Sequence, residues 1–236
     1  MLFDKKYYLI YDYLDYKPLK NSEVTLEHID VLASTQARIH KVKTNISLTN
    51  HYRVIKIDFD KQLKLLKRVD KDVYQVLADN VNTMIDIVKN CNAAIRVLKH
   101  NLCIGHNDYK LLNILWNDMD MVLVDFDALG YSNPTVSLCE SAFTFARMGK
   151  RINYEYYEEY LRSYIKEYGN IKENYKAAII ASFNGKLQWL NYMFSKNGKS
   201  KDNYRDSTKH MIEELILYYK NIDKFNRIYE KVISEL

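Results

Sequence analysis

Three polar side chains in one stretch of the sequence have the types and the spacing that phosphoryl transfer uses. Asp108 belongs to the pattern His-x-Asp-x-x-x-x-Asn, which begins at His106 and ends at Asn113, and Asp125 follows in Val-Asp-Phe-Asp. In this chemistry the first Asp accepts or orients the proton of the acceptor hydroxyl, while the Asn and the later Asp hold Mg²⁺ on the nucleotide phosphates. The spacing therefore predicts Asp108 as the catalytic base and Asn113 and Asp125 as metal ligands that also help to bind ATP.

Two further residues and one similar stretch have chemistry related to this site. His106 is counted with the catalytic loop, where we expect it to support the loop backbone. Asp127 either helps to hold the metal or caps the turn before Gly130, and the sequence favours neither role. A second Asp-Phe-Asp at 58–60 has no His-x-Asp pattern before it and is flanked by lysines, so it is predicted to be a solvated helix start.

Short apolar runs surround the candidate site and must position its side chains. The runs at 102–104, 114–116 and 121–124 read as strands, and the polar residues 117–120 supply turn chemistry between the last two. The pattern predicts a small β-hairpin that presents Asn and Asp side chains from its ends.

The rest of the chain favours helices. Apolar residues recur at helical spacing after Thr25, a plausible N-cap, and again over 71–100, whereas 43–56 is polar and irregular. Beyond Pro134, helices are expected over 135–148, 153–168, 173–197 and 204–233. An aromatic and aliphatic run at 7–14 predicts a buried strand. The predicted fold class is α+β and predominantly α-helical.

Composition narrows the classes of protein. The 236 residues carry 35 basic and 30 acidic side chains without a long basic run, so nucleic acid is not indicated. The three cysteines form no Cys-x-x-Cys pair, and no apolar stretch approaches the length of a membrane span. We expect a cytoplasmic protein with no membrane or nucleic-acid partner.

At these motifs the chain resembles the aminoglycoside phosphotransferase and choline kinase-like families, which share the protein-kinase fold. The stretch 106–115 is similar to their catalytic loop, and 124–134 is similar to their metal-binding loop and the connection after it. Residues 8–14 resemble the last strand of the N-terminal lobe and the hinge, and 32–40 resemble the first helix of the C-terminal lobe. Further on, 185–190 resemble a helix of some bacterial members.

The resemblance implies a division of the chain and more site residues. Residues 1–16 would be a remnant N-lobe strand and hinge, in which the backbone of Asp12 and Tyr13 bonds the adenine. Residues 17–236 would be a helical C-lobe with a catalytic loop at 104–116, a metal loop at 122–130 and substrate-side helices at 135–236. Lys110 occupies the position at which Ser/Thr protein kinases place a lysine near the transferred phosphate, or it is an exposed loop lysine.

One departure from the family limits this expectation. No glycine precedes Gly105, and Lys5 and Lys6 lie too close to the hinge to be the strand lysine that holds ATP in these kinases. Most of the N-lobe half of the nucleotide clamp is therefore expected to be missing, which leaves room for a partner chain that supplies it or for a homo-oligomer.

Three functions stay open at this point. The leading one is ATP- and Mg²⁺-dependent phosphorylation of a hydroxyl on an aminoglycoside- or choline-like small molecule. The alternatives are a truncated pseudokinase or ligand- or partner-binding module without efficient turnover, and a helical adaptor. For the acceptor, carboxylates could meet a cation and two aromatic side chains could stack on it, or all could be solvated surface and core: Glu140, Glu155, Glu158, Glu159, Trp189 and Tyr192.

Overall fold

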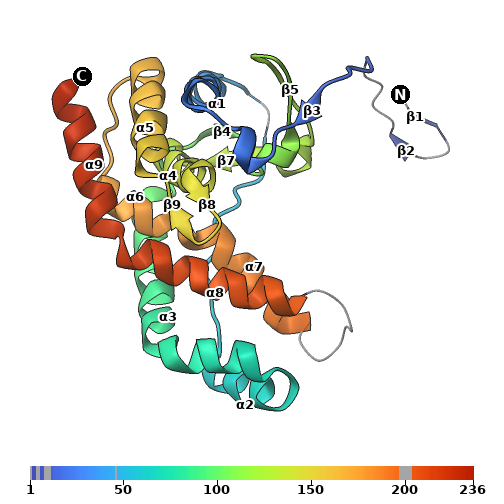
Figure 1. The fold of residues 1–236 in the computed structure, drawn as a ribbon, viewed down its shortest axis with the longest axis vertical. Helices are drawn as coiled ribbons and strands as arrows, with labels where there is room; N and C mark the ends of the chain where they lie inside the picture. Colours follow the sequence, from blue (N-terminus) through green and yellow to red (C-terminus); the bar gives the residue numbers. More distant parts are fainter. Residues whose placement is uncertain (1, 4–5, 8–11, 46, 197–203) are drawn as a thin grey trace.

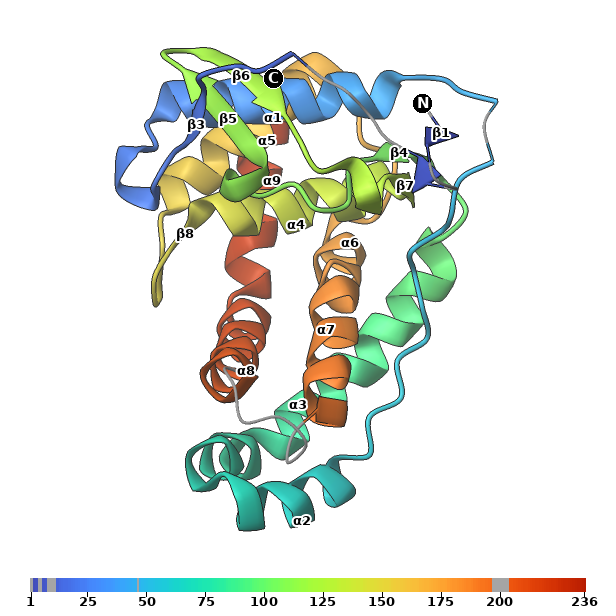
Figure 2. The ribbon, with the colours of Figure 1, turned by 90° about the vertical axis from the view of Figure 1, so that its right-hand side faces the viewer.

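The chain folds into two connected regions, which Figures 1 and 2 show one above the other. The computed structural model describes residues 2–3, 6–7, 12–45, 47–196 and 204–236. The upper region holds the short strands together with α1, α4 and α5, and the lower region holds α2, most of α3, α7 and α8. The elements are β1 (Leu2–Phe3), β2 (Lys6–Tyr7), β3 (Lys17–Pro18), α1 (Leu26–Lys41), α2 (Phe59–Val69), α3 (Lys71–Leu98), β4 (Cys103–Gly105), β5 (Ile114–Asn117), β6 (Asp120–Leu123), β7 (Gly130–Ser132), α4 (Pro134–Ala146), β8 (Arg147–Met148), β9 (Arg151–Ile152), α5 (Tyr154–Tyr168), α6 (Tyr175–Ala181), α7 (Phe183–Lys196), α8 (Tyr204–Lys220) and α9 (Ile222–Glu235).

The predicted fold class is confirmed, and so is the hairpin at its centre. β5 and β6 pair antiparallel from Ile114↔Leu123 to Asn117↔Asp120, with Asp118 and Met119 in the turn between them. The left-handed conformation of Asp118, at φ 50°, is one that Asp and Asn tolerate in turns better than most residues. The hairpin is joined by β3, which pairs with β5 and was not predicted.

The β3 strand shows how the segment after the expected hinge reaches the hairpin. Pro18 can sit there because β3 is an edge strand and the proline lacks a backbone N–H. The Tyr16 hydroxyl donates to the Asp120 carboxylate at 2.6 Å. Residues 12–14 of the predicted buried strand lie in an exposed loop, with Tyr13 89% exposed, so this part of the prediction is wrong. Residues 8–11 lie outside the described part of the chain.

The helix starts follow from their caps. Thr25 caps α1, Asp58 caps α2, and the Asn133 side chain accepts from the backbone N–H groups of Thr135 and Val136 at the start of α4. The second Asp-Phe-Asp is thus the start of a helix, as predicted, and Asp58 and Asp60 are exposed. Within the described residues, no helix combines the length and the apolar character needed to cross a bilayer.

Two of the predicted helices are in fact broken once each. The helix expected over 173–197 divides at Ser182, whose hydroxyl donates to the Ile179 carbonyl at 2.7 Å, a contact that bends helices. The helix expected over 204–233 divides at Asn221, whose side chain bonds both Leu217 and Tyr154. In both cases a polar side chain competes with the regular backbone ladder.

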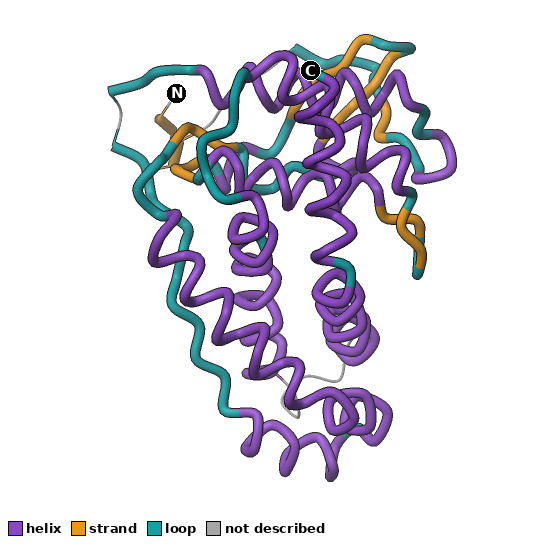
Figure 3. The backbone as a smooth tube through the Cα atoms, turned by 90° about the vertical axis from the view of Figure 1, so that its left-hand side faces the viewer, coloured by secondary structure: helices purple, strands orange, loops and turns teal. Residues whose placement is uncertain are grey.

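The irregular segment between α1 and α2 runs along the molecule as an extended chain, as Figures 2 and 3 show. Side-chain amides from the helices bind its backbone in place of a neighbouring strand. Asn92 of α3 bonds both the N–H and the carbonyl of Ile55 at 2.8 Å, and Asn184 of α7 does the same for Arg53 at 3.2 and 2.7 Å. These contacts meet the requirement that backbone groups near the core find hydrogen-bond partners.

The core is aromatic. Phe143 of α4 lies at its centre, with ring centroids 4.7 Å from those of Tyr218 and Phe225 and 5.5 Å from that of Tyr157. The hydroxyl groups of these tyrosines have partners: Tyr157 bonds Tyr175 at 2.7 Å, and Tyr218 donates to the Phe143 carbonyl at 3.2 Å. Because each buried hydroxyl is paired, the tyrosine-rich core avoids the cost of unpaired polar groups.

Candidate active site

The loop between β4 and β5 holds Asp108 by one of its two carboxylate oxygens. The Asn113 side-chain amide donates to Asp108 Oδ2 at 2.8 Å and to the Asp108 backbone carbonyl at 2.9 Å. Lys110 Nζ lies 2.7 Å from the same Oδ2. No contact to Oδ1 is recorded among the described residues, so that oxygen remains available to accept a proton.

His106 joins this loop to the loop after β6. Its Nε2 lies 3.0 Å from the Val124 carbonyl oxygen, and because a carbonyl only accepts, Nε2 must carry the hydrogen. The His106 ring also packs on Phe126, with centroids 4.9 Å apart. Asn107 adds a second link by donating to the Ala128 carbonyl at 3.0 Å. This is the backbone support expected of His106, which does not face a reacting group in any recorded contact.

Asp125 follows directly from this connection. The Val124 N–H donates to the Asn113 carbonyl at 3.0 Å, so the hairpin brings the backbone of 113 and 124 together and places Asp125 at its end. Asp125 has a left-handed backbone, with φ 64° and ψ 66°, and its side chain is exposed. Such a conformation costs about 1–3 kcal/mol for a residue other than glycine, and it occurs where the surrounding structure enforces it.

The donor set around this point suits a hard divalent cation. The Asn113 amide nitrogen is engaged by Asp108, which leaves its Oδ1 as an acceptor, and the Asp125 carboxylate is exposed. Amide and carboxylate oxygens are the ligands that Mg²⁺ takes in proteins. Among the described residues, no cluster of three or more His, Cys, Asp or Glu side chains is arranged to hold a metal. Asp127 is exposed in the 3₁₀ turn Phe126–Ala128, so its two possible roles stay open.

Two glycines allow the strands behind the loop to approach closely. β4 and β7 pair with Gly105 opposite Gly130. A side-chain carbon at Gly130 would lie 2.4 Å from His51 Nε2 and 2.6 Å from the Thr49 carbonyl, and one at Gly105 would lie 2.3 Å from Ser132 Oγ. Gly130 therefore requires glycine, because the Thr49 carbonyl is backbone, whereas a side chain at Gly105 would have to displace the side chain of Ser132.

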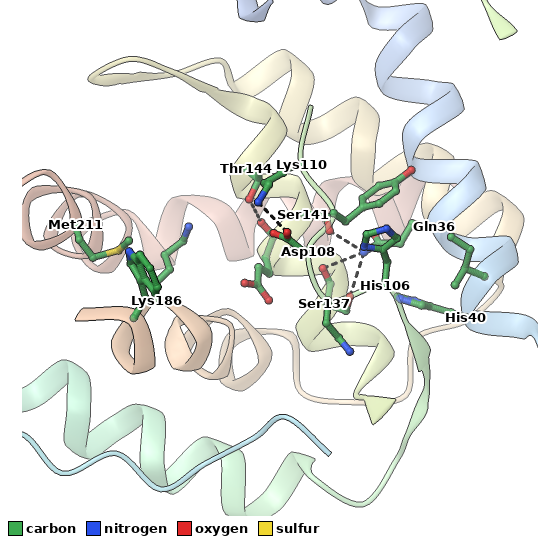
Figure 4. Close-up of a pocket in the computed structure, with 15 residues that line it drawn as sticks. Gln36, His40, His106, Asp108, Lys110, Ser137, Ser141, Thr144, Lys186 and Met211 are labelled. Carbon is green, nitrogen blue, oxygen red and sulfur yellow. Dashed lines mark hydrogen bonds and ion pairs between the residues drawn. The ribbon is translucent and has the colours of Figure 1, made fainter. Parts of the chain in front are cut away.

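Asp108 lines a cavity of about 360 Å³, which Figure 4 shows. Lys110 and Asp108 point towards each other at one side, and Lys186 and Met211 reach in from the lower helices. On the opposite side the Gln36 amide donates to Ser141 Oγ at 2.7 Å and to Ser137 Oγ at 3.1 Å, while the Tyr160 hydroxyl donates to Gln36 Oε1 at 2.9 Å. This fully bonded network makes a rigid wall.

Two glutamates near the cavity, Glu140 and Glu214, differ in their ion pairs. Glu140 forms no ion pair among the described residues, and burial raises its pKa, with Lys186 acting in the opposite direction. Lys186 is itself paired with the buried Glu214 at 3.0 Å, and Arg147 binds the other oxygen of Glu214 at 2.7 Å. Burial alone would raise the pKa of Glu214, but these two cations lower it. Glu140 is thus the carboxylate left to meet a cationic group in the cavity.

Of the carboxylates and aromatics considered for an acceptor, the structure brings only some to the cavity. Glu140 and Trp189 line it, and Tyr192 stacks beside Trp189. Glu155, Glu158 and Glu159 do not line it: Glu158 binds Arg162 and Lys231, and Glu159 accepts from Ser163. These three glutamates are therefore surface residues, which is the second of the two interpretations given for them above.

Several cavity residues were missed in the sequence. Gln36 stood out only as a helical core position, and Lys186 only as part of a family-like helix. Neither has a local signal, because they lie 72 residues or more from Asp108 along the chain and are brought to it by packing. Asp12 and Tyr13 lie in an exposed loop before β3, and no recorded contact joins them to the other site residues.

Comparison with known proteins agrees with this fold. The model of the phosphotransferase enzyme family (APH) matches residues 3–174, about three quarters of the chain, so the chain belongs to that family. A search of curated protein sequences finds no match.

Solved structures share the fold at low sequence identity. Plasmodium vivax ethanolamine kinase has a TM-score of 0.59 at 12% identity, over 91% of this chain and 68% of its own. A spectinomycin phosphotransferase has a TM-score of 0.60 at 13% identity, over 90% of this chain and 70% of its own. An amicoumacin kinase has a TM-score of 0.53 at 13% identity, over 91% and 64%. At these identities the likeness establishes a kinase-like fold.

Proposed function

We propose that this protein transfers a phosphoryl group from ATP to a hydroxyl of a small molecule bound in the cavity beside Asp108. The observation that carries the proposal is the state of the Asp108 carboxylate, which two donors hold by Oδ2 in the cavity wall while Oδ1 stays open. A carboxylate so placed can accept the hydroxyl proton as the bond to phosphorus forms. Family membership supports the same reaction class.

The nucleotide would lie on the other side of Asp108, towards Asp125. Asn113 Oδ1 and the Asp125 carboxylate would hold Mg²⁺, with Asp127 as a further candidate, and the backbone of Asp12 and Tyr13 would meet the base. Bound Mg²⁺ would neutralise charge on the phosphates. The structural relatives offer support, since the spectinomycin phosphotransferase was solved with ADP and the amicoumacin kinase with AMP-PNP and Ca²⁺. In this proposal residues 1–16 serve the nucleotide side, and residues 17–236 form the C-lobe.

The acceptor would carry one cationic group. Glu140 is the carboxylate that lines the cavity without an ion pair, whereas Asp108 is paired with Lys110 and Lys186 with Glu214. A single amine on the acceptor would balance Glu140. The ethanolamine kinase and the spectinomycin phosphotransferase are named for amine-bearing compounds, which agrees with this choice.

The test is ADP release from Mg-ATP with a panel of amino alcohols and aminoglycosides, in the wild type and in Asp108→Asn. Loss of the base should lower the acceptor-dependent rate by about 10²–10⁴-fold. Asp118→Asn is the matched control, because it makes the same change at an exposed hairpin turn that also tolerates Asn. Acceptor binding without any ADP release that depends on Asp108 would replace the proposal with a ligand-binding module.

A further inference from the structure

Charged side chains of alternating sign lead away from the catalytic cavity: Glu140 of α4, Lys186 of α7, Glu214 of α8 and Arg147 of β8. Glu140 and Lys186 line the cavity, whereas Glu214 lies behind it, with its side chain only 5% exposed. Lys186, which Figure 4 shows reaching in from α7, therefore has two carboxylates near it. Which of them it pairs with decides the charge that the cavity presents to a ligand.

Glu214 is the carboxylate that binds Lys186. Lys186 Nζ lies 3.0 Å from Glu214 Oε1, and Arg147 Nη1 lies 2.7 Å from Glu214 Oε2, so each oxygen of this carboxylate has its own cation. Arg147 is itself fixed in the β8–β9 turn, since its Nε donates to the Gly149 carbonyl at 3.1 Å. A carboxylate as buried as Glu214 depends on such partners, because an unpaired buried charge is costly.

Glu140 lies close to the same lysine but is not bonded to it. A side-chain carbon on Gly185, the residue before Lys186, would lie 3.2 Å from Glu140 Oε1, so this carboxylate lies against the backbone of α7. Lys186 also lowers the pKa of Glu140, against the effect of burial. In the part of the chain that the structure describes, no ion pair is recorded for Glu140, whereas Asp108, the other carboxylate of the cavity wall, is paired with Lys110.

We propose that Glu214 is a positioning residue, which holds Lys186 away from Glu140 and so keeps Glu140 free for a cationic ligand. Without the charge of Glu214, Lys186 would turn to Glu140, and a cation that enters the cavity would find no unpaired carboxylate. This inference rests on the proposed function, because it takes a cationic group of the acceptor to meet Glu140.

NMR titration with propylammonium, without nucleotide and at constant ionic strength, tests this role. The probe carries a cation but no hydroxyl, so it cannot be phosphorylated. A pH of about 8.5 favours the ionised form of Glu140, whose pKa burial raises, while an alkylammonium keeps its charge there as lysine does. Glu214→Gln keeps the shape of the side chain and removes its charge. It should weaken the binding of propylammonium about tenfold, which corresponds to the loss of one charge-assisted contact.

Further variants separate this role from a general effect on the structure. In Lys186→Met no competing cation remains, so adding Glu214→Gln to it should change the dissociation constant by less than about twofold. Lys186→Met alone should bind the probe at least as tightly as the wild type, which keeps the test decisive even if Glu214→Gln does not fold. Glu158→Gln is the matched control and should bind like the wild type, because Glu158 also pairs with two cations, Arg162 and Lys231, but does not line the cavity.

Several results would overturn the inference: no binding of propylammonium to the wild type at about 50 mM, unchanged binding in Glu214→Gln, an equal loss when the same change is made in Lys186→Met, or weaker binding in Lys186→Met alone. The proposed function fails separately. If the titrations behave as expected but no acceptor gives ADP release, the role of Glu214 stands and phosphoryl transfer does not. If ADP release depends on Asp108 while Glu214→Gln binds the probe like the wild type, the reverse holds.

Discussion

The two carboxylate oxygens of Asp108 have different surroundings, since one is hydrogen-bonded and the other is available to a substrate. Lys110 and Asn113 both bind Oδ2, so the orientation of the group is fixed without occupying Oδ1. The Lys110 pair is about half exposed, and a pair with that exposure contributes at most about 1 kcal/mol to folding. The pair therefore adds little to folding, and both roles considered for Lys110, near the transferred phosphate or as an exposed loop lysine, stay open.

The metal side makes a prediction at Asp125. Asp125→Asn should remove most of the thermal stabilisation given by millimolar Mg-ATP, because it deletes a charged ligand while keeping a residue that tolerates the left-handed backbone. Binding at 100 times the dissociation constant stabilises by about 2.7 kcal/mol, so the loss is measurable by thermal unfolding.

Asp127→Asn is the companion variant, with the same change two residues further on. A loss of stabilisation in it as well would assign Asp127 to the metal, and an unchanged shift would assign it to the turn. A wild type without any Mg-ATP shift would contradict the nucleotide site as a whole.

At the scale of elements, the helices hold the extended segment through their side chains. Asn92→Ala should lower the free energy of unfolding by about 1–3 kcal/mol, since it leaves the N–H and carbonyl of buried Ile55 without partners. Asn226→Ala is the control: its amide bonds only Glu230 on the surface, and its effect should stay within about 0.5 kcal/mol. Denaturant unfolding measures both. Equal effects would mean that the segment is not held by Asn92.

Features that depend on residues close together in the chain could be predicted from the sequence, and features that depend on contacts between distant residues could not. The hairpin, the N-cap at Thr25 and the helix start at 58–60 depend on neighbours in the chain, and the structure contains all three. The breaks at Ser182 and Asn221 interrupt apolar patterns that continue on both sides, so periodicity gave no warning. The pairing of β3, and the position of Lys186 in the cavity, depend on packing between distant segments.

At the scale of the whole molecule, a buried histidine couples folding to pH. His40 of α1 is buried against α5, where its ring is bonded to the Tyr164 hydroxyl at 2.6 Å, and burial lowers its pKa to about 3. In the unfolded chain a histidine titrates near 6.5. Between these values the unfolded state binds more protons than the folded state, so stability falls as the pH drops through this window and is unaffected above it.

His40→Gln should therefore flatten the acid side of the stability curve. Its amide can keep a hydrogen bond to Tyr164 without gaining a charge. The wild type should lose up to about 1.4 kcal/mol per pH unit more than the variant between pH 6.5 and 3. Denaturant unfolding at several pH values measures the difference, and parallel curves for the two proteins would contradict it. His100→Gln is the control, because His100 is exposed.

The amides that bind the segment before α2 also decide where this protein can change. Asn92 and Asn184 bind backbone atoms of residues 53 and 55, so at these two residues the path of the segment is fixed through its backbone as well as through the buried side chain of Ile55. Residues 51 and 52 belong to the same segment, and they line a cavity of about 400 Å³ that adjoins the one beside Asp108. Tyr52 is constrained as well, because its hydroxyl accepts from the Asn133 N–H at 2.8 Å at the start of α4. His51 is the residue of the two for whose side chain no hydrogen bond is recorded among the described residues, so mutations there can change the cavity wall while the contacts of Asn92 and Asn184 remain. Variation in specificity should therefore accumulate at residue 51, and invariance at the two asparagines that hold the segment.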